Sequence, residues 1–182
     1  MGADQRARLA DRPIPPILGA VAVRRARFLA FPAFELTTED GLRVGMGRFS
    51  VLNIYLGWGQ RLDLPWGARW RLIAVEQGSM LRPVVVNEAR RRLAMAAAGI
   101  GNYGINGRDY AYTLNPAEAR MGRAGRWDLF AGEERLARFT RRPFGALCEQ
   151  PLPLPAVLLG LLLTRFSVPG EGSSHVPEMR WG

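Results

Sequence analysis

Arginine runs are the features of this sequence that could bind a ligand. They are Arg24, Arg25 and Arg27; Arg90, Arg91 and Arg92; and Arg141 and Arg142. A guanidinium group binds phosphate or carboxylate through paired hydrogen bonds, so arginines that meet in the fold can form an anion site. Adjacent side chains on a strand point to opposite faces, so only part of each run can join one patch. We therefore predict an anion or lipid-headgroup site from a subset of them, with a solvated surface as the alternative.

Other chemistry-bearing residues form no recognisable catalytic or metal-binding set. The single cysteine, Cys148, and the single histidine, His175, leave no Cys–His or Ser–His pair and no zinc-ligand cluster. The acidic residues are scattered, and no pair has the context of general acid–base catalysis. Cys148 lies between apolar residues and is expected to be buried. We predict no catalytic residue, no metal and no cofactor.

A glycine motif at 99–104, G-I-G-N-Y-G, matches the dinucleotide-binding pattern G-x-G-x-x-G. That pattern binds a nucleotide only between a strand and the start of a helix. Here a second turn, Asn106-Gly107, and an alternating strand follow it. The motif is therefore interpreted as a glycine-rich connection.

Charge points to an anionic partner. The chain of 182 residues has 25 basic side chains, all arginine, against 16 acids, and its net charge is +9. Codon bias in a GC-rich genome explains arginine in place of lysine, whereas the excess charge attracts anions. Anionic phospholipid or a protein is the expected partner. Nucleic acid is less favoured, because Tyr110 and Tyr112 share a strand face with Leu114 and fit a core face better than a stacking surface.

A hydrophobic segment at 152–166 determines the expected architecture. Residues 154–163 carry no polar side chain, so a helix here is apolar on all sides and belongs in an interior or a membrane. It spans roughly 22 Å, whereas a bilayer core needs about 30 Å. We expect no membrane-spanning helix and a buried one instead. Its expected core residues are Leu154, Val157, Leu158, Leu161 and Leu162. The alternative is an anchor lying in one leaflet, with Arg165 at the interface.

The rest of the chain has the two-residue period of strands. Residues 34–49 form a hairpin around Asp40-Gly41, and Pro83 places its strand at an edge or a bulge. Many short strands before one apolar helix predict a mostly β fold: a closed antiparallel barrel of short strands wrapped around a central C-terminal helix. We assign residues 1–26 to an N-terminal arm, 27–166 to the barrel and 167–182 to a disordered tail.

A targeting signal is not expected at the N-terminus. Pro13, Pro15 and Pro16 interrupt the apolar stretch, and Asp4 and Asp11 spoil a basic region. We expect a cytoplasmic protein that can lie at the inner membrane surface.

Three segments carry a family resemblance: INGRDY at 105–110, WDLFAGEERLARFTRRPF at 127–144 with the apolar helix after it, and the hairpin at 34–49. In these the chain resembles the tubby C-terminal-like superfamily, particularly its LURP-one-related and phospholipid scramblase branch. The resemblance implies a twelve-stranded barrel threaded by a hydrophobic helix, with lipid binding through basic residues. The chain departs from scramblases, because it has no acidic cluster suited to calcium and no spanning helix.

The expected function is therefore a non-enzymatic module that binds or scaffolds through an anionic ligand or lipid headgroup. The alternatives are a peripheral membrane protein anchored by residues 152–166 and a nucleic-acid-binding basic β domain.

Overall fold

Twelve strands and one helix make up the described part of the chain. The structure, a computed structural model, describes residues 14–28, 31–47, 60–77, 80–99, 102–117 and 125–166. The strands are β1 (Ile17–Phe28), β2 (Phe31–Thr38), β3 (Arg43–Met46), β4 (Gln60–Asp63), β5 (Arg69–Gln77), β6 (Met80–Val86), β7 (Arg92–Ala98), β8 (Tyr103–Gly107), β9 (Ala111–Pro116), β10 (Arg126–Ala131), β11 (Glu134–Arg141) and β12 (Phe144–Leu152), and the helix is α3 (Leu154–Phe166). The predicted tail at 167–182 lies outside these residues.

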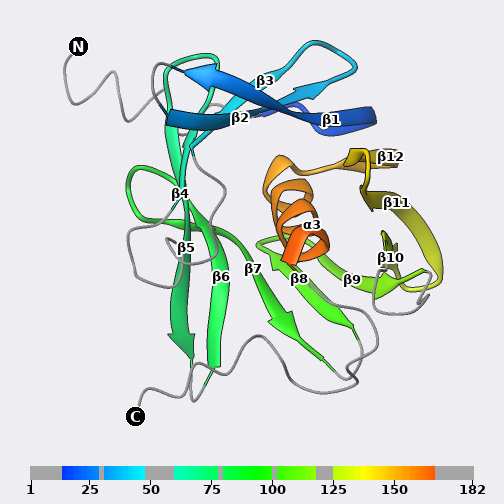
Figure 1. The fold of residues 1–182 in the computed structure, drawn as a ribbon. Coiled ribbons are helices and arrows are strands. Elements are labelled where there is room, and N and C mark those ends of the chain that lie inside the picture. The colour runs from blue at the N-terminus through cyan, green and yellow to red at the C-terminus, as the bar shows by residue number, and fades with distance from the viewer. Residues whose placement is uncertain are drawn as a thin grey trace.

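The strands form a closed antiparallel barrel, which confirms the predicted fold class (Figure 1). Each strand pairs with its neighbours in sequence, and β1 closes the ring by pairing with β12 as well as β2. A closed ring leaves no unpaired sheet edge, which is where sheets aggregate. Because the connection is a simple meander, successive turns lie alternately at the two ends of the barrel.

Strand β1 corrects the predicted domain boundary. The sequence assigned residues 1–26 to an arm, but Ile17–Phe28 form the closing strand of the barrel. Ile17 and Val21 are buried, and Val21 lies opposite Ala146 of β12. The prolines at 15 and 16 precede this strand instead of interrupting it, and the small residues of Gly19-Ala20-Val21-Ala22 hid its alternation. Barrel residues therefore begin about ten positions earlier than the sequence suggested.

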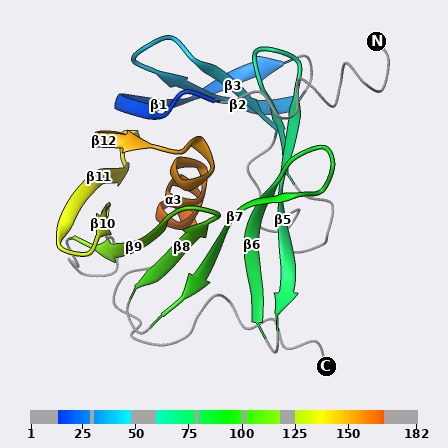
Figure 2. The ribbon, with the colours of Figure 1, turned by 180° about the vertical axis from the view of Figure 1, so that it is seen from behind.

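Helix α3 runs through the barrel off its centre. It contacts β6, β7 and β8 and also β10, β11 and β12, and both views show it enclosed by strands (Figures 1 and 2). Buried alanines and Cys148 on this nearer wall lie beside large buried side chains such as Ile105, Leu129 and Phe139. Large side chains also fill the wall of β2 to β5: Leu36, Val44, Met46, Leu62, Trp70 and Leu72. The helix therefore lies against the half of the wall made by β6 to β8 and β10 to β12.

The helix residues named from the sequence are all in the core, as predicted. Leu154, Val157, Leu158, Leu161 and Leu162 are each at most 5 % exposed. Full burial of one such side chain contributes about 1.5–3 kcal/mol to folding. Within the described part of the chain, no helix has the length and apolarity required to cross a bilayer.

Of the two local strand predictions, the hairpin within 34–49 is confirmed and an edge position for the strand of Pro83 is wrong. The hairpin of β2 and β3 is present, and Gly41 has the positive φ of 86° that its turn requires. Pro83 does not make an edge, because β6 lies between β5 and β7. Its ladder to β7 covers only Val84 to Val86, and a register shift, a β-bulge or irregularity, falls between Val85 and Val86, close to Pro83.

The glycine motif at 99–104 joins two strands, as interpreted from the sequence. The N–H of Gly99 donates to the carbonyl of Asn102 at 2.8 Å, and β8 begins at Tyr103. A strand, not a helix, follows the motif, so it lacks the helix N-terminus that a dinucleotide site needs.

Candidate anion-binding pocket at the start of the helix

Polar side chains gather at the end of the barrel where α3 begins. The meander brings the β6–β7 turn, the β8–β9 turn and the connection from β12 to α3 to this same end. Between them lies a partly open pocket of about 490 Å³, which we call the helix-start pocket. Its lining residues are Ile14, Trp70, Asn87, Arg91, Arg92, Leu93, Ala94, Asn106, Gly107, Arg108, Asp109, Tyr110, Pro153, Leu154 and Pro155.

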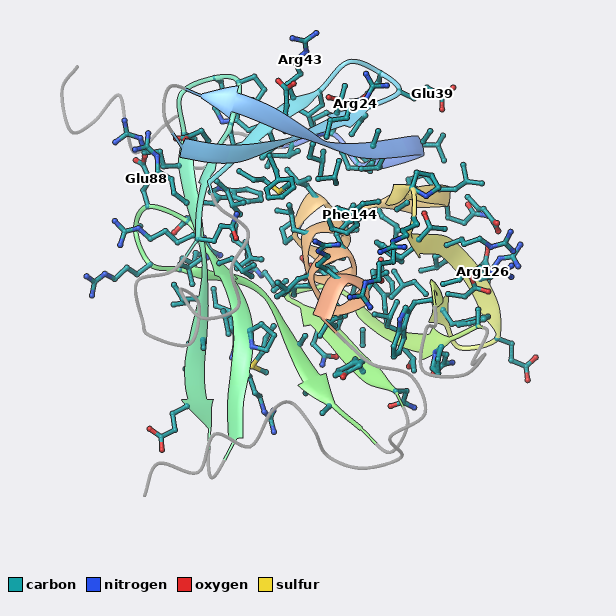
Figure 3. The ribbon with its side chains drawn as sticks, in the orientation of Figure 1. Arg24, Glu39, Arg43, Glu88, Arg126 and Phe144 are labelled. Atoms are coloured by element: carbon teal, nitrogen blue, oxygen red, sulfur yellow. The ribbon has the colours of Figure 1, made fainter. Side chains whose placement is uncertain are left out.

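The β6–β7 turn positions two of the pocket arginines. Asn87 holds the turn, because its Oδ1 accepts the N–H of Arg91 at 2.9 Å and its carbonyl accepts the N–H of Arg90 at 2.9 Å. Arg90 takes the left-handed conformation, φ 59°, at a position where three-residue hairpin loops usually place glycine. Arg91 and Arg92 follow it and line the pocket, whereas Arg90 does not. Glu88, labelled in Figure 3, marks this turn.

The β8–β9 turn contributes Arg108 and Tyr110. The N–H of Gly107 donates to the carbonyl of Tyr110 at 3.0 Å, which closes the turn. The Tyr110 ring lies directly over Gly107, where an added Cβ would come within 2.2 Å of it. It also stacks on Tyr112 with the ring centres 4.9 Å apart. Arg108 and Asp109, at the tip of the turn, are highly exposed, and 4.0 Å separates their charged groups.

The third wall is the first turn of α3. Its N-terminus carries the positive end of the helix dipole, and no acidic residue in the first turn offsets it. Prolines at 153 and 155 have no N–H to donate. Leu154, as the first helical residue, has an N–H without an intrahelical acceptor. The helix therefore adds positive potential to the arginines.

Two buried polar groups in the lining have no partner in the described structure. Trp70 is only 5 % exposed, and its indole Nε1 finds no acceptor among the described residues. The hydroxyl of Tyr110 is buried and likewise lacks a partner there. Leaving a buried donor unpaired costs about 1–3 kcal/mol. Neither group has a partner among the described residues that offsets this cost.

Electrostatics favour an anion here. Three arginines and one aspartate line the pocket. Burial, and secondarily the neighbouring Tyr112, raises the pKa of Tyr110, so its phenol stays protonated and can donate a hydrogen bond. The arginines and the Tyr110 hydroxyl can donate hydrogen bonds to an anion, whereas the carboxylate of Asp109 can only accept them.

Among the described side chains, part of the set of arginines chosen from the sequence lines this pocket. Arg91 and Arg92 line the helix-start pocket, while Arg90 is exposed beside it. Of the others whose side chains the structure describes, three lie away from the pocket: Arg24, Arg141 and Arg142. Arg24 points outward from β1, opposite Glu35 (Figure 3). The side chains of Arg25 and Arg27 lie outside the described part of the structure.

Arg141 and Arg142 occupy the β11–β12 turn, which the meander places at the far end of the barrel. At that end Arg165, in the last turn of α3, lies over the Phe144 ring at 5.7 Å. Phe144 is labelled in Figure 3. The length of the helix therefore separates this pair from Arg91 and Arg92.

Sequence reasoning missed Trp70, Asn87, Arg108 and Tyr110 as pocket residues. Trp70 and Asn87 lie on other strands and turns than Arg108 and Tyr110, which share the β8–β9 turn, so no single local motif joins all four. The order of the turns along the chain could have shown which of these residues lie at the same end of the barrel. In a meander the turns after β6 and β8 lie at the same end, and both turn sequences, NEARR and GRDY, contain arginine.

A second polar cluster, on the outer face of β10 to β12, is held together by ion pairs among its own members. Asp128 is 7 % exposed and lies 3.4 Å from Arg138 Nε. Arg126 and Arg135 also approach its carboxylate, at 3.7 and 4.0 Å. Arg135 bonds Glu149 with both Nε and an Nη, at 3.0 and 2.9 Å. These contacts tie three strands together, so we interpret the cluster as structural.

Comparison with protein families, curated proteins and solved structures gave no match. Among the described residues there is also no group of three or more His, Cys, Asp or Glu side chains that could hold a metal ion.

Proposed function

We propose that the protein is a non-enzymatic binding module that holds an anionic group in the helix-start pocket. The observation that carries the proposal is the meeting of Arg91, Arg92 and Arg108 with the N-terminus of α3 around one pocket. Guanidinium groups and a helix N-terminus both favour phosphate and carboxylate.

The chemistry of the lining supports binding over catalysis. Arginine keeps its charge at all physiological pH values, and the raised pKa of Tyr110 keeps its hydroxyl protonated. The resemblance to tubby-like proteins, in which basic residues on the barrel bind lipid, agrees with this proposal. A phosphate group on a lipid or on a soluble molecule would meet the same donors.

Charge-removing substitutions test the proposal. In Arg91→Gln/Arg92→Gln we expect at least a tenfold loss of affinity for inorganic phosphate, measured by calorimetry, because each charged hydrogen bond contributes about 1.5–3 kcal/mol. Co-sedimentation with vesicles of equal parts phosphatidylglycerol and phosphatidylcholine tests the lipid source of the same group.

Arg90→Gln/Arg142→Gln is the matched control, since it also removes two charges, one from the same turn outside the pocket and one at the far end. Binding that falls equally in the two double variants reflects net charge and contradicts a pocket. Wild-type protein that binds neither phosphate nor vesicles also rejects the proposal.

A further inference from the structure

We infer that the ligand of the helix-start pocket is a small amphipathic anion, with a phosphate or carboxylate at the arginines and an apolar body that reaches Trp70. The inference rests on the proposed function and specifies its ligand. It follows from how exposure and polarity are distributed over the lining.

The lining divides into a charged outer part and an apolar inner part. Arg91, Arg92 and Arg108 are exposed, with 79 % of the Arg108 side chain accessible. Trp70, Ala94 and Leu154 are at most 5 % exposed and form the inner wall. Ile14, Leu93, Pro153 and Pro155 add further apolar surface. A ligand that only carried charge would leave this inner surface unused.

Size supports a ligand larger than a phosphate ion. The pocket has a volume of about 490 Å³. Sites for small organic ligands span about 300–1,000 Å³ and are mostly apolar with a few placed polar groups. A phosphate group alone fills a small part of this space.

Trp70 indicates how deep the ligand reaches. Its indole N–H can only donate, and it lies buried in the inner wall without an acceptor in the described structure. A polar atom on the ligand body, or an anionic oxygen that enters fully, would satisfy it. The buried hydroxyl of Tyr110, on the β8–β9 turn, offers a second donor.

Calorimetry of the full chain with matched probes tests the inference. The probes are inorganic phosphate, 1-naphthyl phosphate, octyl phosphate and the neutral 1-naphthol, alongside the phosphatidylglycerol vesicles. We expect 1-naphthyl or octyl phosphate to bind at least tenfold more tightly than inorganic phosphate and than 1-naphthol, since both halves of the pocket contribute.

Trp70→Phe keeps an aromatic ring and removes the N–H, so we expect about a tenfold loss of affinity for the better organic phosphate. Trp127→Phe is the control: Trp127 is equally buried and its Nε1 is equally unpartnered in the described structure, but it does not line the pocket. Its affinity should equal that of wild type. Arg91→Gln, at an exposed position, gives a second readout that does not disturb the core, and thermal unfolding verifies that each variant is folded.

The outcomes separate the two proposals. Equal binding of inorganic and organic phosphates keeps the anion pocket but overturns the amphipathic ligand. Binding to vesicles with none to the soluble phosphates overturns it in favour of a membrane surface. An equal effect of Trp70→Phe and Trp127→Phe also overturns it. Absence of binding to every probe rejects both the proposed function and this inference.

Discussion

Buried polar atoms without a protein partner distinguish individual residues in this barrel. Trp70 and Trp127 share such a group, since each indole Nε1 is buried and unpartnered in the described structure. Their surroundings differ. Trp127 packs against the Tyr103 ring at 5.6 Å, whereas Trp70 borders the helix-start pocket. Residue type and burial therefore do not define the site, and position beside accessible space does.

Cys148 gives a prediction at the scale of one residue. It is 2 % exposed, and burial raises the pKa of its thiol from about 9 to about 12. Between these values the thiol ionises in the unfolded chain but not in the folded one. Folding stability from this group is therefore complete below pH 9 and decreases as the pH rises toward 12.

Urea unfolding at several alkaline pH values, for wild type and Cys148→Ala, measures this effect. The free energy of unfolding should fall more steeply with pH in wild type, because the tyrosines titrate in both proteins and cancel in the difference. Parallel curves would contradict a buried, neutral thiol.

At the scale of elements, the contact between α3 and β11 depends on Gly160. A Cβ built at Gly160 comes within 2.4–2.9 Å of three atoms of the Phe139 ring, and Phe139 is completely buried. The ring therefore occupies the space that any other residue at 160 would need. Glycine in mid-helix costs about 1 kcal/mol relative to alanine, so close packing outweighs helix propensity here.

Gly160→Ala should therefore destabilise the protein by up to about 2 kcal/mol, since an overpacking cost of ~1–3 kcal/mol is offset by about 1 kcal/mol of helix propensity. Denaturant unfolding measures the change. Adding Phe139→Leu should relieve the clash, so the double variant should lose less stability than the two single variants together. A stabilised Gly160→Ala protein would show that the helix and β11 are not in contact as described.

Elements differed in how far the sequence could predict them. The apolar run of α3 and the alternation of β2 and β3 are local patterns, and the structure confirms both. β1 was missed because small residues after three prolines hide its period. The helix-start pocket was missed because Trp70, Arg92 and Tyr110 are far apart in the sequence. They come together only because alternate turns of a closed meander lie at the same end of the barrel. The end of the barrel at which a turn lies depends on whether an odd or an even number of strands precedes it. A short stretch of sequence does not contain that number.

At the scale of the whole molecule, the closed ring and the threaded helix require each other. The barrel encloses a space that α3 fills, and α3 is apolar on all sides and needs a complete wall. Its direction also makes the two ends of the barrel different. One end has the helix N-terminus with Arg91, Arg92 and Arg108, and the other has Arg165 over Phe144. The pocket therefore depends on the integrity of the whole barrel.

Leu159→Asp tests this dependence. Leu159 is fully buried, so the variant places an unpaired carboxyl group in the core, at a cost that can exceed about 4–5 kcal/mol. Since many domains are stable by only 5–15 kcal/mol, we expect loss of the folded barrel, and with it loss of anion binding. Leu159→Ala, at about 2–5 kcal/mol, gives a graded version whose unfolding remains measurable.

Leu147→Asp is the matched control for Leu159→Asp, because Leu147 lies on β12 with 46 % of its surface exposed. It should stay folded and differ little from wild type, as judged by circular dichroism and the unfolding midpoint. The alternative role of residues 152–166, an anchor lying in one membrane leaflet, predicts the reverse for the helix. A Leu159→Asp protein that keeps a folded barrel and only releases from membranes would establish the anchor and reject the threaded core.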